Sequence, residues 1–308
     1  MFEEIMVNGS TFIKSAEGKG SNQGAFYKGI DGKEFYVKWE LDNLENEKKF
    51  QNEHLALKLY ELLGVRVAPA ELVRFENGPK KYIGIKSEKT TLSTLGEREP
   101  AYAVVDYSKA KVDFLLDCYL ANWDVIGLGY DNLCFSEPDG EVLRLDTGGA
   151  LFYRAHGYKK GDAFNNTSNE FENFLDVKVN PQASKVFSGI YEDISCDSSL
   201  TKGLWKLLSV SDENVEACIK ANSFTEAALN DKLVKVLASR RKALISKAEP
   251  KVFNKVIARY YMEACSEGDT SWRGVAGNKG ARPIKRLKHG GMHVARVAIH
   301  TQSIAQAL

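Results

Sequence analysis

The feature that most constrains the fold is a change in hydrophobic periodicity near residue 109. Residues 9–40 alternate apolar and polar positions between Gly-rich turns, the pattern of half-buried β-strands. Beyond residue 109, apolar residues recur mostly at helical spacing. We therefore expect a small sheet-rich part first and a larger, mostly helical part after it, an α+β chain with two lobes.

The first part is predicted as an antiparallel meander with one main helix. Its expected strands are residues 11–13, 24–27, 34–39, 65–75 and 82–86. Asp31-Gly32 is a hairpin signal between the second and third strands. A polar start at Asn43 and leucines at helical spacing predict a helix that ends at Gly64.

The second part is predicted to begin with a buried helix over residues 109–120. Short strands at 132–136 and 142–145 follow, and the polar residues 157–181 are expected to form a long surface loop. Further helices are expected at residues 200–208, 213–220, 225–247 and 252–265, with Ser211 and Thr225 as N-caps of two of them. We place the boundaries at 1–100 for the first lobe, 101–270 for the second and 271–308 for a tail.

Composition excludes several classes of protein. With 44% hydrophobic residues among 308, the chain is not mainly disordered, and it contains no apolar run long enough to span a membrane. Met1–Glu4 lacks the basic-then-apolar start of a signal peptide. The five cysteines lack metal-ligand spacing and are interpreted as reduced thiols, so a cytoplasmic location is expected.

The charge is unevenly distributed. Residues 271–308 carry seven Lys or Arg and no Asp or Glu, which leaves a net charge of −6 on the first 270 residues. A basic tail on an acidic body indicates contact with an anion such as a lipid head group or a polyphosphate. A solvated tail without a ligand is the alternative. Nucleic acid is an unlikely partner, because Trp272 is the tail's only aromatic residue.

Two motifs in the first part bear on phosphate binding. The loop from Gly18 to Gly24 lets backbone N–H groups approach a phosphate, although most such hairpin loops bind nothing. Lys38 lies inside a predicted strand and needs an anionic partner. Glu53 in the following helix is the candidate, with Glu45 and Glu47 as competitors; a purely structural ion pair is the alternative interpretation.

Two motifs in the second part carry carboxylates. Asp124 follows the buried helix in Asn122-Trp123-Asp124, and Asn132 comes eight residues later, which suits a base and a metal ligand. Asp146 follows a short strand and precedes two glycines, so it can project into a cleft and hold Mg²⁺. Ordinary turns would also explain both motifs.

In this order, the motifs resemble the atypical branch of the protein kinase superfamily. The likeness is to the HipA and phosphatidylinositol 3/4-kinase-like group and to Legionella-type bacterial effector kinases. It covers residues 9–157, and more loosely the helices up to 265. It rests on the Gly-rich loop, Lys38, Asn52-Glu53-His54-Leu55, Asn122-Trp123-Asp124 and Asp146-Thr147-Gly148-Gly149.

The resemblance implies a two-lobed kinase-like fold, ATP and Mg²⁺ or Mn²⁺ as cofactors, and a role for each motif. Lys38 would contact the α- and β-phosphates and be oriented by Glu53. Asp124 would orient the acceptor hydroxyl, and Asn132 and Asp146 would hold the metal. The phosphates would be covered by Gly18, Gly20, Ser21, Asn22, Gln23 and Gly24.

The chain departs from these kinases in one spacing. They usually have five positions between the catalytic Asp and the metal-binding Asn, whereas Asp124 and Asn132 are eight apart. Either the loop carries an insertion, or Asp131 takes part of the role of Asp124.

Two functions follow as hypotheses. The first is a kinase that transfers the γ-phosphate to phosphatidylinositol or to a protein Ser/Thr hydroxyl. An inositol polyphosphate or anionic lipid at Lys285, Arg286 and Lys288 would be its activator, and a secreted bacterial effector delivered to the host cytosol would be silent without it. The second, favoured by the unusual spacing, is an inactive kinase-like module that binds a nucleotide or a partner.

Overall fold

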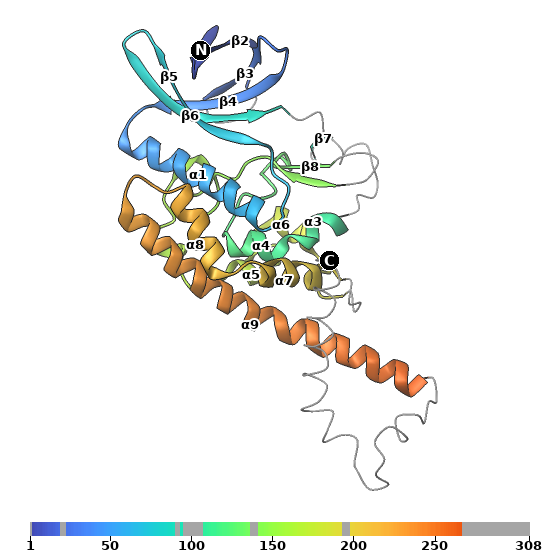
Figure 1. The fold of residues 1–308 in the computed structure, drawn as a ribbon. Coiled ribbons are helices and arrows are strands. Elements are labelled where there is room, and N and C mark those ends of the chain that lie inside the picture. The colour runs from blue at the N-terminus through green and yellow to red at the C-terminus, as the bar shows by residue number, and fades with distance from the viewer. Residues whose placement is uncertain are drawn as a thin grey trace.

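The structure is a computed structural model that describes residues 2–18, 23–89, 93–94, 107–135, 141–192 and 198–266. It is a mixed α/β structure with a β-sheet in its N-terminal part and mostly helices in its C-terminal part (Figure 1). The boundary predicted at residue 100 and the tail 271–308 lie outside the described residues. No described helix is both long enough and apolar enough to cross a membrane.

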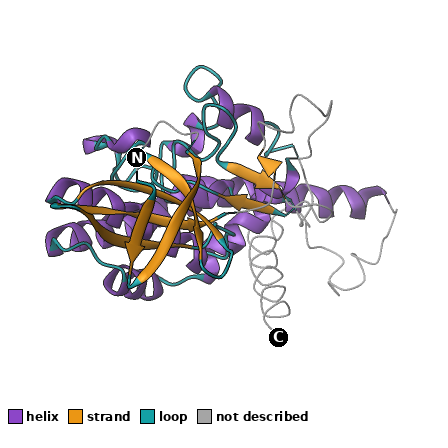
Figure 2. Ribbon diagram, turned by 90° about the horizontal axis from the view of Figure 1, so that it is seen from above, coloured by secondary structure: helices purple, strands orange, loops and turns teal. Residues whose placement is uncertain are grey.

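Six antiparallel strands form the N-terminal sheet in the order β1-β2-β3-β4-β6-β5, which lies over the helices when seen from above (Figure 2). Strand alternation buries Val37 and Trp39 on one face, in an apolar cluster with Tyr27 and Phe75. The strands are β1 (Glu4–Val7), β2 (Ser10–Glu17), β3 (Gly24–Gly29), β4 (Glu34–Leu41), β5 (Ala70–Asn77) and β6 (Lys80–Glu88).

The sequence predicted most of this sheet. The expected strands at 11–13, 24–27, 34–39 and 82–86 are confirmed, whereas β1 was not anticipated. The strand expected from residue 65 begins only at Ala70. Residues 66–68 pair with Arg144 instead: the Arg144 N–H donates to Arg66 O at 3.0 Å, and the Ala68 N–H donates to Arg144 O at 3.0 Å.

Helix α1 (Leu44–Leu62) packs on the other face of the sheet. The Asn43 side chain caps its start by accepting from the N–H groups of Glu45 and Asn46, and Gly64 follows its end with φ +69°. Phe50 packs against Ile83 and Ile85 of β6. Because residues three apart share a helix face, Glu53 is directed toward the same sheet.

The C-terminal part combines helices with a small three-stranded sheet. The small sheet contains β7 (Ser93–Thr94), β8 (Leu133–Phe135) and β9 (Val142–Arg144). The helices are α3 (Ser108–Val112), α4 (Phe114–Tyr119), α5 (Glu170–Asn173), α6 (Pro181–Phe187), α7 (Ser199–Ser209), α8 (Asp212–Ala221) and α9 (Ala227–Ser266), with short 3₁₀ turns at Ala155–Gly157 and Gly161–Ala163.

Several helix predictions need correction. The helix expected at 109–120 is interrupted at Asp113, which divides it into α3 and α4. The two helices expected at 225–247 and 252–265 form one helix, α9, with Pro250 inside it. Ser211 caps α8 as predicted. Thr225 does not cap α9, which begins at Ala227; its hydroxyl accepts from Gln51 Nε2 at 2.8 Å.

The surface loop predicted at 157–181 is largely wrong. Six of its residues are buried: Lys160, Phe164, Ser168, Glu170, Phe171 and Phe174. The segment carries α5 and lies against α4 and α9, and its phenylalanines belong to the main apolar cluster of the C-terminal part. The polar composition of the segment does not indicate this burial. Its buried polar groups form hydrogen bonds and ion pairs with partners inside the protein instead of with water.

A buried ionic cluster fixes β9 to the helices. The Arg144 guanidinium, which is fully buried, pairs with Asp117 at 2.7 Å and with Asp113 at 3.2 Å. Tyr60 of α1 donates to the same Asp117 carboxylate at 2.9 Å, and Lys206 of α7 pairs with Asp113 at 2.7 Å. Four elements thus meet at the strand that leads directly to Asp146.

We expect Asp117→Ala to lower the free energy of unfolding by about 3–5 kcal/mol, because it leaves the buried Arg144 charge without its closest partner. Lys58→Ala, which removes an exposed pair with Glu61 on α1, should cost less than about 1 kcal/mol. Urea unfolding of both variants measures the difference. Equal losses would mean that the buried cluster contributes no more than a surface pair.

Candidate functional site

Lys38 lies between two carboxylates from different parts of the chain. It follows Val37 on β4 and therefore points to the opposite face of the sheet, toward α1. Its Nζ lies 2.5 Å from Glu53 Oε1 and 3.2 Å from Asp146 Oδ2. The three residues come from β4, from α1 and from the loop after β9, so the contact joins the N-terminal sheet to the C-terminal part.

The sequence left three partners open for Lys38, and the structure places Glu53 there. Glu45 pairs with Lys159 at 2.6 Å. Glu47 pairs with Arg74 of β5, also at 2.6 Å. Both competitors lie in the first turn of α1, more than one turn before the position that faces Lys38.

Burial and charge act in opposite directions on these groups. Burial lowers the pKa of Lys38, but the Asp146 and Glu53 carboxylates outweigh it and hold that pKa above its usual value. Burial raises the pKa of Asp146, yet Lys38 and the Gly148 N–H bring it below its ordinary value. For Glu53 burial dominates and raises the pKa to about 7, despite Lys38. The site therefore holds a fixed ammonium beside an ionised Asp146.

Helix α1 is hydrogen-bonded to the segment after β9 at several points. Thr147 Oγ1 donates to the Glu53 carbonyl at 3.0 Å. The fully buried Asn52 side chain donates to Ala150 O and accepts from the Phe152 N–H, each at 3.0 Å. These bonds fix the position of Glu53 relative to Asp146 through the backbone as well as through Lys38.

Asp124 and Asn132 meet in spite of their spacing. Asn132 Nδ2 donates to Asp124 O at 2.6 Å and to Asp124 Oδ2 at 3.2 Å. The intervening residues fold into tight turns, with Gly127 at φ +77° and Tyr130 at φ +57°. Asp131 is exposed at the end of these turns. Asp124 is therefore the carboxylate that engages Asn132, and the residues between them form a compact series of turns.

Two glycines bring the Asp124 loop against the Asp146 loop. A β-carbon on Gly149 would lie 2.8 Å from Asp124 Cβ, closer than such atoms approach. A β-carbon on Gly148 would lie 3.1 Å from both Asp146 Oδ1 and Glu53 Oε2. The two glycines thus lie between Lys38 and its carboxylate partners on one side and Asp124 on the other. Larger residues at these two positions would push the two loops apart.

The Gly-rich loop is described only at its two ends. Gly18, Gln23 and Gly24 are described, whereas Gly20, Ser21 and Asn22 lie outside the described residues. Gly24 is the direct cross-strand partner of Lys38. A β-carbon on Gly18 would lie 2.5 Å from Gly24 O, so the two ends of the loop approach closely beside Lys38.

The donor set near Asp146 suits a magnesium ion that also binds phosphate. Asp146 supplies a carboxylate, one-third exposed, and Asn132 supplies an amide oxygen, since its nitrogen is used by Asp124. The described residues contain no group of three or more His, Cys, Asp or Glu that could hold a metal. One carboxylate, one amide oxygen, water and phosphate are ligands that Mg²⁺ accepts.

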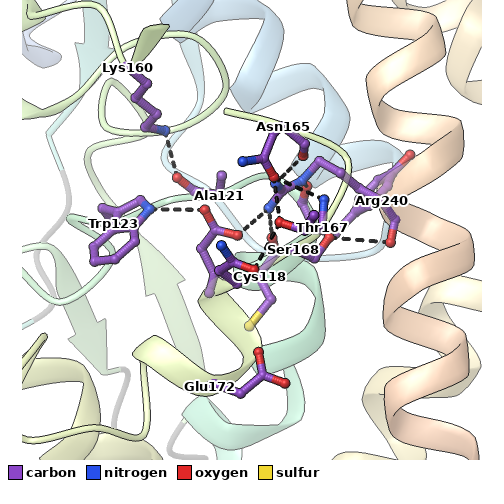
Figure 3. Close-up of polar contacts among 12 residues, drawn as sticks. Cys118, Ala121, Trp123, Lys160, Asn165, Thr167, Ser168, Glu172 and Arg240 are labelled. Atoms are coloured by element: carbon purple, nitrogen blue, oxygen red, sulfur yellow. Dashed lines mark hydrogen bonds and ion pairs between the residues drawn. The ribbon is translucent and has the colours of Figure 1, made fainter. Parts of the chain in front are cut away.

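Some residues around the site were missed from the sequence. Lys160 donates to Ala121 O and to Gly149 O, one in each loop, and Arg240 of α9 binds the end of α4. Figure 3 shows the contact of Lys160 with Ala121 and the position of Arg240 near Cys118. Glu170 accepts from Trp123 Nε1 at 3.0 Å. A lysine inside a polar segment and an arginine in a long helix carry no pattern that marks them as buried, so sequence reasoning had no signal to use.

Comparison with known proteins does not assign the chain to a family. No protein-family model and no curated protein matches the chain. Among solved structures, the chain is similar to the crystal structure of the Helicobacter pylori proinflammatory kinase CtkA. The two share 12% sequence identity and a TM-score of 0.46, and the match covers 77% of this chain and 94% of that one. The inferences below therefore rest on the geometry of the site.

We expect Glu53→Gln to remove a pH dependence of stability. The folded-state pKa of about 7 exceeds the ordinary 4.5, so this group's stabilisation is complete below pH 4.5 and is lost as the pH rises through 7. The urea midpoint of the wild type should therefore fall from pH 5 to pH 8 relative to that of the variant. Glu61→Gln, on the exposed side of α1, is the matched control. Parallel pH profiles for wild type and Glu53→Gln would contradict the assignment.

Proposed function

We propose that this chain is an atypical kinase that transfers the γ-phosphate of ATP to a hydroxyl acceptor and has the two-lobed kinase-like fold. One observation carries the proposal: Lys38 of the sheet meets Glu53 of α1 and Asp146 after β9, and Asp124 packs against the glycines that follow Asp146. An ammonium, a metal-binding carboxylate and a second carboxylate gathered this way fit phosphoryl transfer, where catalysis is mainly positioning and charge neutralisation.

Each side chain has a role consistent with its surroundings. Lys38 brings a charge that two carboxylates keep in place, and it would bind the α- and β-phosphates beside the Gly18–Gly24 loop. Glu53 orients Lys38. Asp124, held by Asn132, would orient the acceptor hydroxyl and accept its proton. Mg²⁺, or Mn²⁺, would be held by Asp146 and Asn132 and would neutralise phosphate charge.

The alternative of an inactive nucleotide-binding module loses its main support. It rested on the eight-residue separation of Asp124 and Asn132. The residues between them fold into tight turns and leave the two side chains hydrogen-bonded, which supports the active pair that we propose. The proposed site retains Lys38, Asp124, Asn132 and Asp146 together.

The acceptor is proposed from the resemblance alone. Phosphatidylinositol and a protein Ser/Thr hydroxyl are the two candidates. The basic tail, with Lys285, Arg286 and Lys288, would bind an inositol polyphosphate or anionic lipid as an activator; it lies outside the described residues. An effector that depends on a host polyanion would act in the host cytosol, at a membrane surface if the acceptor is a lipid.

The test is transfer of radiolabelled γ-phosphate from ATP·Mg²⁺. Reactions contain phosphatidylinositol liposomes or a eukaryotic lysate, each with and without inositol hexakisphosphate. We expect label in lipid or protein with the wild type, and at least about 100-fold less with Asp146→Ala or Asp124→Asn. Asp131→Asn is the matched control, since that carboxylate is exposed on the inserted turn, and it should retain activity.

Three results would change the proposal. Full activity in Asp146→Ala would remove the metal role of that residue. Loss in Asp131→Asn with retention in Asp124→Asn would transfer the catalytic role to the inserted turn. Absence of label from the wild type in every reaction, together with measurable ATP binding, would favour the inactive module.

A further inference from the structure

Lys160 is a buried lysine whose described side-chain hydrogen bonds all go to backbone carbonyls, with the Phe164 ring centroid 5.8 Å from its Nζ. The residue comes three positions after the 3₁₀ turn at Ala155–Gly157, and only 5% of it is exposed. Its side chain is directed into the C-terminal part. Its Nζ lies 2.6 Å from Ala121 O, 2.8 Å from Gly149 O and 2.9 Å from Leu151 O. Figure 3 shows the side chain reaching Ala121.

The charged form of the lysine fits this arrangement. Three carbonyl oxygens accept from one nitrogen, whereas a neutral amine has only two N–H donors. Burial lowers the pKa of Lys160 well below its ordinary value, and Arg240 and Arg154 lower it further. Glu170 raises this pKa, but its ion pair is with Arg240. Burying an ammonium against carbonyls alone is costly. That cost indicates a role in fixing the positions of the segments that the lysine joins.

The three carbonyls belong to the two loops of the proposed site. Ala121 lies three residues before Asp124, and its φ of +53° turns the chain sharply at the end of α4. Gly149 and Leu151 lie three and five residues after Asp146. The Leu151 N–H also donates to Leu120 O at 2.8 Å. Lys160 therefore holds the Asp124 loop and the Asp146 loop at the point where they touch.

A second buried cation fixes the Asp124 loop from the other side. Arg240 of α9 donates to Cys118 O at 2.6 Å and to Tyr119 O at 2.9 Å, and it pairs with Glu170 at 2.6 Å. The other oxygen of Glu170 accepts from Trp123, the neighbour of Asp124. Arg240 thus anchors one loop to α9, whereas Lys160 contacts both loops.

We propose that Lys160 is a positioning residue for phosphoryl transfer, which sets the distance between Asp124 and Asp146 by binding the backbones of their two loops. The inference rests on the proposed kinase function. Without the ammonium, the three carbonyls lose their shared donor and the loops separate. Nucleotide binding by Lys38 and Asp146 persists, but the acceptor and the phosphate are no longer aligned.

The test compares Lys160→Met with Lys247→Met in the full chain. Lys247 also donates to a carbonyl, Ser168 O at 3.1 Å, and to Glu172, but it touches neither loop. Steady-state transfer from ATP·Mg²⁺ to water, or to the acceptor found above, gives kcat and KM. We expect Lys160→Met to lower kcat by roughly 100-fold. Its KM for ATP should change by less than about threefold, and Lys247→Met should resemble the wild type.

A measurement without nucleotide separates this inference from the kinase proposal. Amide hydrogen exchange over residues 119–124 and 146–152 should accelerate together in Lys160→Met and remain unchanged in Lys247→Met. If Lys160→Met does not fold, Lys160→Gln, which retains two N–H donors, replaces it, and an intermediate loss of kcat is expected.

The outcomes are distinct. Loss of kcat with coupled faster exchange supports the proposal. Normal kcat, or faster exchange in only one segment, overturns it. A wild type that neither binds ATP nor transfers phosphate overturns the kinase proposal and the catalytic role of Lys160 with it, while coupled exchange in that case would still establish the link between the loops.

Discussion

The contact of Lys38 with Glu53 and Asp146 is the interaction on which the arrangement of the molecule depends. Burying the Lys38 ammonium in the sheet is costly unless anionic groups offset the cost, and its two carboxylate partners come from α1 and from the loop after β9. Satisfying the charge therefore requires the sheet, its helix and the C-terminal part to meet at one place. Asn52 and Thr147 reinforce this meeting with hydrogen bonds between the same two segments.

Buried cations recur around the site, and each binds a segment that carries a functional side chain. Arg144 joins β9 to α4 and α1 directly before Asp146. Arg240 satisfies the carbonyls at the end of α4, before Asp124. Cations placed against helix C-terminal carbonyls are favoured by the helix dipole. The two loops are thus fixed from the side of the helices, with the Asp146 carboxylate directed toward Lys38 and the Asp124 carboxylate toward Asn132.

Sequence reasoning succeeded where a pattern has one structural meaning. Alternation identified the strands that carry Lys38 and its neighbours, and the sequence named Glu53 as the candidate partner of Lys38 without excluding Glu45 and Glu47. Sequence reasoning failed where the composition did not match the burial. The segment 157–181 was expected on the surface because polar residues such as its lysines and asparagines are normally exposed. Pro250 favoured a break in the last helix, yet α9 continues through it. The distance between Asp124 and Asn132 depended on turn geometry at Gly127, which spacing alone does not determine.

The most direct measurement is a calorimetric titration of ATP into the wild type and into Lys38→Met, with and without Mg²⁺. The account predicts that the wild type binds ATP more tightly with Mg²⁺, and that Lys38→Met loses most of the affinity while remaining folded. Binding that is indifferent to Mg²⁺ and to Lys38, or no binding at all, would contradict the claim that these three charged groups form a nucleotide site.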